Sequence, residues 1–316
     1  MITSYSRQAP CRRRHMSDPS QRPTTDKITV ALTEMLPTPS TSHVPFERIY
    51  EPAEDSYLLL DTLSSPSEVA FLRHRFRQYP ELTNDAGGDR RSPLVVEVGT
   101  GSGVVLAFLT AHAGAIFGRE DVLTLGTDVN CYACHASQKT VAHAVDGFMS
   151  TNDAALPVKS VPGPAKYLDS LLTDLCAPLR SGVTDVLVFN PPYVPTSSLP
   201  SLPEIDAKTA VSSSASSASS LKDDSHLLAL SYAGGIDGME TTDRLLAELD
   251  YLLDQHWGVA YVLLCAQNKP EEVKHRIQHS VFGWVVETVG RSGKAAGWEK
   301  LEVLRIWRQD REIVAS

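Results

Sequence analysis

The stretch LVVEVGTGSGVV at residues 94–105 indicates the fold of this chain. An apolar run is followed directly by three glycines at alternate positions, and a second apolar run comes after them. The first run is typical of a buried strand, and glycine lets the backbone turn sharply and approach a ligand without a Cβ in the way. The stretch therefore predicts a strand at 94–98, a tight turn and a helix at 103–113.

The same alternation of strand and helix continues along the chain. Further strands are expected at 122–127, 183–189 and 259–266, and further helices at 130–144, 237–253 and 270–279. Continuous apolar strands that alternate with helices predict a parallel sheet covered on both faces. Two last strands, 282–289 and 299–307, have a short connector and predict an antiparallel edge pair. We expect a doubly wound α/β fold.

Charge and composition exclude several classes of protein. The formal charge of −9, from 29 basic and 38 acidic residues, is unfavourable for a general binder of nucleic acid. No apolar run approaches the ~20 residues of a bilayer span, so a membrane-spanning protein is excluded. Five cysteines, an odd number without a secretory signal, predict a reducing compartment. We expect the cytoplasm, with the nucleus as a second location.

Three segments have a composition that predicts they lie outside the packed domain. Residues 1–44 are rich in Ser, Thr, Pro and Arg and predict a disordered tail. Residues 197–226 are rich in serine and predict a flexible insertion, and 311–316 form a short C-terminal tail. One domain, 45–310, remains.

The glycine turn and two carboxylates predict the kind of ligand. Asp128 ends the next strand, where a carboxylate can bind ribose hydroxyls, and Glu97 lies just before Gly99 and Gly101. A carboxylate at Glu97 would repel the pyrophosphate of a dinucleotide, so the pattern favours S-adenosylmethionine, which carries an amino acid and a sulfonium cation. Glu97 as a helix cap and Asp128 as a turn residue remain the structural alternatives.

Asn190-Pro191-Pro192-Tyr193 follows the strand that ends at Phe189. Two prolines make a rigid, extended segment, so the Asn190 side-chain oxygen and the Pro191 carbonyl can each accept one hydrogen of a planar NH₂ group. Tyr193 is expected to pack on the flat face of that group. Transfer would be accelerated by alignment at about 3 Å and by placed dipoles. A proline-ended strand without chemistry is the alternative.

These stretches resemble the eukaryotic and archaeal HemK-related glutamine methyltransferases of class I release factors. The matching segments are YEPAEDS (50–56), EVGTGSGVV (97–105), TDVN (127–130), TDL (173–175) and LVFNPPYV (187–194). The likeness covers about residues 44–308. It implies a class I methyltransferase fold, Rossmann-like with seven mainly parallel strands, and N5-methylation of the glutamine in a Gly-Gly-Gln motif.

The resemblance also implies roles for single residues. In the family's cofactor site, the methionine end meets residues that match Ser56, Glu97 and Gly99, the ribose meets the match of Asp128, and the adenine region meets those of Asp174 and Leu175. Gly101 and Asn190 complete the expected cofactor-binding set. Residues that match the family's catalytic and substrate site are Asn190, Pro191, Pro192 and Tyr193. Read alone, Asp174 fits a surface loop residue better than a ligand, and only together with the other motifs does it favour the cofactor.

The resemblance implies two partners, the release factor as substrate and a small zinc-binding activator that covers an apolar sheet edge. We expect no metal on this chain itself, because the CYACH run at 131–135 fits an ordinary helix with two buried thiols. Other activities that stay open are methylation of an amino group in nucleic acid, as in N6-adenine methyltransferases, and methylation of lysine in proteins.

Overall fold

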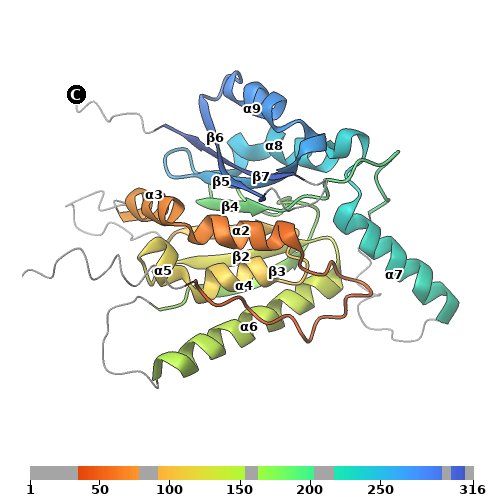
Figure 1. Cartoon of the computed structure of the whole chain (residues 1–316), viewed down its shortest axis with the longest axis horizontal. Coiled ribbons are helices and arrows are strands. Elements are labelled where there is room, and N and C mark those ends of the chain that lie inside the picture. The colour runs from red at the N-terminus through yellow and green to blue at the C-terminus, as the bar shows by residue number, and fades with distance from the viewer. Residues whose placement is uncertain (1–34, 78–91, 154–162, 203–216, 294–299, 310–316) are drawn as a thin grey trace, which may run out of the picture. The chain divides into compact units, whose positions relative to one another are not determined.

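The sheet of this protein has seven strands in the order β3-β2-β1-β4-β5-β7-β6 (Figure 1). The computed structural model describes residues 35–77, 92–153, 163–202, 217–293 and 300–309, and all of these except Met35 belong to one compact unit, Leu36–Ser316. The strands are β1 (Leu94–Val98), β2 (Leu123–Asp128), β3 (Lys166–Leu172), β4 (Val186–Phe189), β5 (Val259–Cys265), β6 (Trp284–Arg291) and β7 (Leu301–Arg308). Strands β1 to β5 pair in parallel, and β7 is antiparallel to both β5 and β6. The predicted fold is confirmed.

Helices cover both faces of this sheet. They are α2 (Glu54–Ser64), α3 (Pro66–Arg77), α4 (Val104–Ala111), α5 (Ala113–Phe117), α6 (Cys131–Asp153), α7 (Ser217–Tyr232), α8 (Glu240–Leu252) and α9 (Pro270–Gln278). Neighbouring strand residues point to opposite faces, so Val95 packs with α2 to α5 while Val96 packs with α8 and α9. None of the described helices combines the length and apolar composition that a membrane crossing requires.

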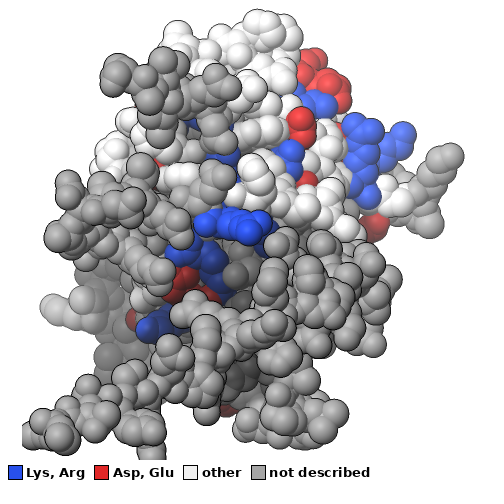
Figure 2. All heavy atoms as spheres, turned by 90° about the vertical axis from the view of Figure 1, so that its left-hand side faces the viewer, with Lys and Arg blue, Asp and Glu red and all other residues white. Residues whose placement is uncertain are grey.

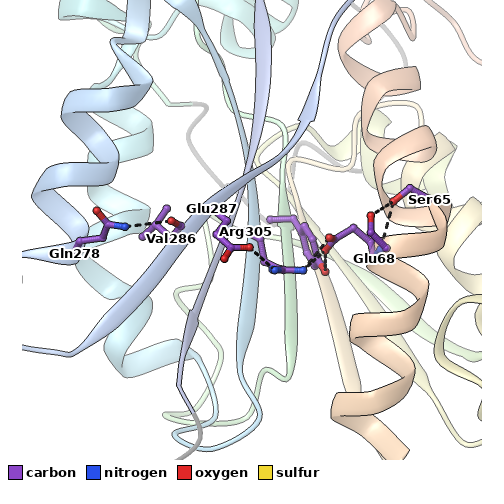
Figure 3. A network of polar contacts seen from close by, with 8 residues as sticks. Ser65, Glu68, Gln278, Val286, Glu287 and Arg305 are labelled. Atoms are coloured by element: carbon purple, nitrogen blue, oxygen red, sulfur yellow. Dashed lines mark hydrogen bonds and ion pairs between the residues drawn. The ribbon is translucent and has the colours of Figure 1, made fainter.

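A buried ionic network fixes α3 to the sheet (Figure 3). Arg305 of β7 donates from Nη1 to both carboxylate oxygens of Glu68, at 2.8 and 2.9 Å, and from Nη2 to Glu287 at 2.7 Å. The Tyr261 hydroxyl donates to the same Glu68 carboxylate at 2.8 Å. Removing one partner of such a pair leaves a buried charge, which costs about 3–5 kcal/mol. The network therefore also holds the adjoining helix α2, whose first turn reaches the carboxyl edge of the sheet.

The structure corrects two of the predicted segments. Val44 is only 6% exposed, and the Pro37 carbonyl lies 3.0 Å from the His112 ring, so the described end of the expected tail packs on the domain. Helix α7 begins at Ser217, inside the segment interpreted as a flexible insertion. Residues 1–34, 203–216 and 310–316 lie outside the described part of the chain.

Candidate active site

A cleft opens at the carboxyl ends of β1, β2 and β4. Val98 is in register with both Thr127 and Phe189, so the residues that follow these three strands meet at one edge. The cleft encloses about 1260 Å³, part of it open to solvent. Predicted site residues that line it are Ser56, Glu97, Gly99, Gly101, Asp128, Asp174, Leu175, Asn190 and Pro192.

Asp128 is held by the turn it faces. Its Oδ2 accepts the Gly101 amide at 2.9 Å, and its Oδ1 accepts the Asn130 amide at 2.8 Å. The carboxylate is buried, and this loss of solvent raises the pKa of Asp128 to about 6 despite the hydrogen bonds that stabilise its charge. A fixed carboxylate beside the glycine turn fits the hydroxyls of a ribose.

Glu97 provides a second buried carboxylate in the cleft. Burial raises its pKa well above the usual range, a hydrogen bond from the Leu106 backbone opposes the rise, and the charge of Asp128 adds to it. Its Oε2 is buried and has no hydrogen-bond partner among the residues that the structure describes. A buried acceptor without a partner is costly, so a cationic or N–H-bearing ligand would relieve it. The amino group and sulfonium of S-adenosylmethionine meet that requirement.

The glycine turn requires glycine for two different reasons. Gly99, Gly101 and Gly103 all have positive φ, at 69°, 51° and 78°. A Cβ on Gly103 would lie 2.4 Å from the Ser137 Cα, so α6 packs directly on the turn. A Cβ on Gly101 would meet nothing within 4 Å, because this residue faces the cleft. The turn thus closes on the protein at one end and leaves room for a ligand at the other.

Cofactor affinity is expected to fall at acid pH. Ribose hydroxyls donate to the ionised form of Asp128, and with a pKa of about 6 that form predominates only above this pH. The Kd for S-adenosylmethionine should therefore rise about tenfold between pH 7 and pH 5, as calorimetry can measure. Asp128→Ala should bind more weakly at pH 7 and lose most of this dependence, and any dependence that survives belongs to Glu97. Equal affinity of the two proteins at pH 7 would contradict the ribose role.

Asn190 has one polar atom bound within the protein and one without a hydrogen-bond partner among the described residues. Its Nδ2 donates to Asp55 Oδ2 at 3.0 Å, whereas its Oδ1 is buried without a hydrogen-bond partner. The Tyr193 hydroxyl donates to the same Asp55 oxygen at 3.4 Å. Asp55 therefore fixes the orientation of the Asn190 amide, and Oδ1 is left as an acceptor for a donor that enters the cleft.

The other predicted site residues do not all line the cleft. The Ser56 amide donates to Asp55 Oδ1 at 2.6 Å, and Asp174 forms an ion pair with Arg244 at the edge of the cleft. Pro191 is buried and is not among the cleft residues. The Tyr193 side chain belongs to the core and its hydroxyl donates to Asp55, so the expected packing of its ring on the substrate amide stays a prediction.

The sequence reading missed three residues of this site. Asp55 lies within the YEPAEDS segment, directly before the predicted site residue Ser56. Arg244 belongs to α8, which carries no motif. Asn268 donates from Nδ2 to the Tyr193 carbonyl at 3.0 Å and so anchors the segment after β4. An asparagine soon after a predicted strand is the sequence signal that could have indicated Asn268.

Comparison with known proteins gives full-length relatives. The eRF1 methyltransferase catalytic subunit Mtq2 of Schizosaccharomyces pombe is 32% identical over 277 residues, which are 87% of this chain and 96% of that protein. Methyltransferase HEMK2 of Homo sapiens is 28% identical, over 86% of this chain and 97% of that protein. A Methanocaldococcus jannaschii protein, whose name proposes a protein N5-glutamine methyltransferase, is 27% identical over 82% and 92%. No family model matches the chain.

Solved structures match only weakly. The human methyltransferase 10 domain containing protein covers 90% of this chain and 93% of its own, with a TM-score of 0.40 and 13% identity.

The strand order, the glycine turn with its two carboxylates and the full-length relatives define a class I S-adenosylmethionine-dependent methyltransferase. Within that class, the chain belongs to the eukaryotic and archaeal HemK-related methyltransferases, the family of Mtq2 and HEMK2.

Proposed function

We propose that this enzyme methylates the N5 nitrogen of the glutamine in the Gly-Gly-Gln motif of a class I translation termination factor. The names of two relatives, an eRF1 methyltransferase and a proposed N5-glutamine methyltransferase, support this substrate. We also propose the cytoplasm as its location, with the nucleus second.

One observation carries the proposal. The buried Oδ1 of Asn190 lacks a partner and its amide cannot turn without breaking the bond to Asp55. An acceptor fixed in this way complements an N–H of a primary carboxamide, which has two such hydrogens.

The chain's own residues act mainly by alignment. The cofactor supplies a methyl group on a positively charged sulfur. Glu97 and Asp128 hold the methionine end and the ribose, and Asn190 holds the glutamine amide so that its nitrogen faces the methyl group at near-attack distance. The N–C bond forms as the S–C bond breaks, and the surplus amide proton leaves to solvent. An amide nitrogen is a weak nucleophile, so position and placed dipoles supply most of the rate.

The charges around the cleft are unfavourable for nucleic acid. Its lining includes four carboxylates, Asp55, Glu97, Asp128 and Asp174. Its two arginines, Arg48 and Arg244, are each ion-paired, with Asp224 and Asp174. On the side where α3 and α5 lie, Figure 2 shows described Lys and Arg side chains interspersed with Asp and Glu. Phosphate binding needs surplus cations, so a nucleic-acid substrate is disfavoured.

Methyl-labelled cofactor tests the proposed function. The enzyme is incubated with the termination factor, with and without the activator, and the labelled peptide is mapped. We expect the label on the Gly-Gly-Gln glutamine and none on a factor in which that glutamine is alanine. Duplex DNA and a histone are run in parallel, and label on either of these in place of the factor would refute the proposal.

We further propose that the zinc-binding activator covers the outer edge of β3. This strand ends the sheet order, and within the described residues no other strand pairs with its outer side. Leu168 and Leu172, four residues apart on this strand, are 52% and 40% exposed. An exposed apolar edge strand invites aggregation unless a partner covers it.

Leu168→Asp combined with Leu172→Asp is expected to abolish co-purification with the activator. The reason is that two charges would have to be buried in the interface. The double variant should stay soluble without the activator, since the apolar edge is gone. Tyr251→Asp, which changes an exposed residue of α8, serves as the control and should keep the activator. A double variant that still binds it would place the activator elsewhere.

A further inference from the structure

The chain leaves the sheet after the Asn-Pro-Pro-Tyr segment and returns to the same place. The Val194 amide donates to the Tyr232 carbonyl at 2.9 Å, and the Gly234 amide donates back to the Val194 carbonyl at 2.8 Å. The Thr196 amide then donates to the Gly235 carbonyl at 2.9 Å. These bonds form a closed neck, so the excursion between them is anchored directly beside Asn190.

The described parts of this excursion contribute an apolar rim to the cleft. Its members are Leu199, Pro200, Leu202, Leu227, Leu230 and Ser231. The first three precede α7 and the others belong to α7, which stands at one end of the sheet in Figure 1. No member of the rim is charged. The rim is thus continuous with the catalytic cleft and chemically different from its acidic floor.

An ion pair fixes the position of α7 beside the rest of the cleft. Asp224 of α7 lies 2.6 Å from the guanidinium of Arg48, and that guanidinium also stacks over the Tyr132 ring at 4.5 Å. Arg48 is in turn fixed through its carbonyl, which accepts the Asn130 side-chain amide at 2.8 Å. Asn130 follows the cofactor carboxylate Asp128 by two residues. The rim therefore has a defined position relative to the cofactor site.

We infer that the apolar rim is a binding subsite for the uncharged, small-residue peptide backbone on either side of the acceptor glutamine. The inference rests on the proposed function and extends it to substrate selection. Apolar side chains can pack on a glycine-rich backbone, and they offer neither carboxylates to a lysine-rich tail nor cations to a phosphate. Specificity would come from the rim, whereas Asn190 aligns the reacting nitrogen.

Charged substitutions in the rim test this subsite. Leu227→Asp is expected to raise the KM for the termination factor at least tenfold, with kcat at saturation and the Kd for the cofactor changed less than threefold. A factor with lysines beside the glutamine should be a poor substrate of the wild-type enzyme and a better one for this variant. Leu202→Asp changes a residue that is 46% exposed, so it repeats the test from the other side of the rim at little cost to folding. Val281→Asp, at a residue 94% exposed, is the control and should match the wild type.

The outcomes separate the subsite from the proposed function. A wild-type enzyme that leaves the factor unlabelled refutes the function itself. A labelled factor whose KM is unchanged in both Leu227→Asp and Leu202→Asp overturns the subsite alone. A raised KM with a cofactor Kd raised equally would also overturn it, since the rim would then act on the cofactor site.

Discussion

Asn190→Ala is expected to lower kcat about 10²–10³-fold while the enzyme still binds its cofactor. Removal of one preorganised hydrogen-bonding group at a reacting centre, such as an oxyanion-hole donor, lowers kcat by about that factor. The Asn190 Oδ1 has no hydrogen-bond partner among the described residues, so its loss removes an interaction made with the substrate, and the loss of Nδ2 removes one hydrogen bond to Asp55. Single-turnover rates with labelled cofactor measure the loss directly.

Cofactor titration and thermal unfolding provide the control for this variant. Asn190 also lines the cofactor cleft, so we expect the Kd for the cofactor to change by up to about fivefold. This change is well below the expected loss of rate. The Asp55 carboxylate keeps its bonds to Ser56 and Tyr193 in the variant, which limits the damage to the surrounding structure. A variant with wild-type kcat would show that Asn190 does not align the substrate.

The cofactor half of the site could be predicted because local sequence determines it. Alternate glycines after a buried strand permit only a few backbone paths, and Gly99, Gly101 and Gly103 all adopt the positive φ that other residues avoid. Parallel strands end at a common edge, so Asp128 had to meet that turn once both strands were recognised. Pattern and geometry agree at these positions.

Other features escaped prediction because long-range packing decides them. Strand β3 is exposed along one edge, and its sequence KYLDSLL shows neither a continuous apolar run nor clean alternation. Glu68 and Arg305 are 237 positions apart, and each alone resembles a surface charge. The Tyr193 hydroxyl likewise has its partner far away in the sequence, a buried carboxylate in α2. Helix α7 lies in a serine-rich segment whose composition favours a loop.

Asp55→Asn is expected to lower kcat about 100-fold by reversing the amide of Asn190. The Ser56 amide, 2.6 Å from Asp55 Oδ1, keeps the oxygen of the new side chain in that position. Its NH₂ group then faces the Asn190 NH₂, and two donors cannot pair. Asn190 relieves this contact by turning, which directs its own N–H groups at the substrate amide. Asp185→Asn is the control at a second buried carboxylate, whose Oδ2 accepts the Leu94 amide at 2.8 Å, a donor that an asparagine oxygen can also accept.

Exchange of the two side chains provides the sharper test of this positioning role. In Asp55→Asn with Asn190→Asp, the new amide donates to one carboxylate oxygen at residue 190, and the other oxygen faces the substrate as an acceptor. We expect at least tenfold higher kcat than in Asp55→Asn alone. The exchanged pair should also exceed Asn190→Asp, in which two carboxylates face each other and one must take up a proton. The comparison of the exchanged pair with Asn190→Asp remains decisive if Asp55→Asn proves unstable, because each of these two proteins retains at least one carboxylate at the site. If Asp55 had only a structural role, the exchange would not restore activity. An exchanged pair no more active than either single variant would therefore show that Asp55 does not orient Asn190.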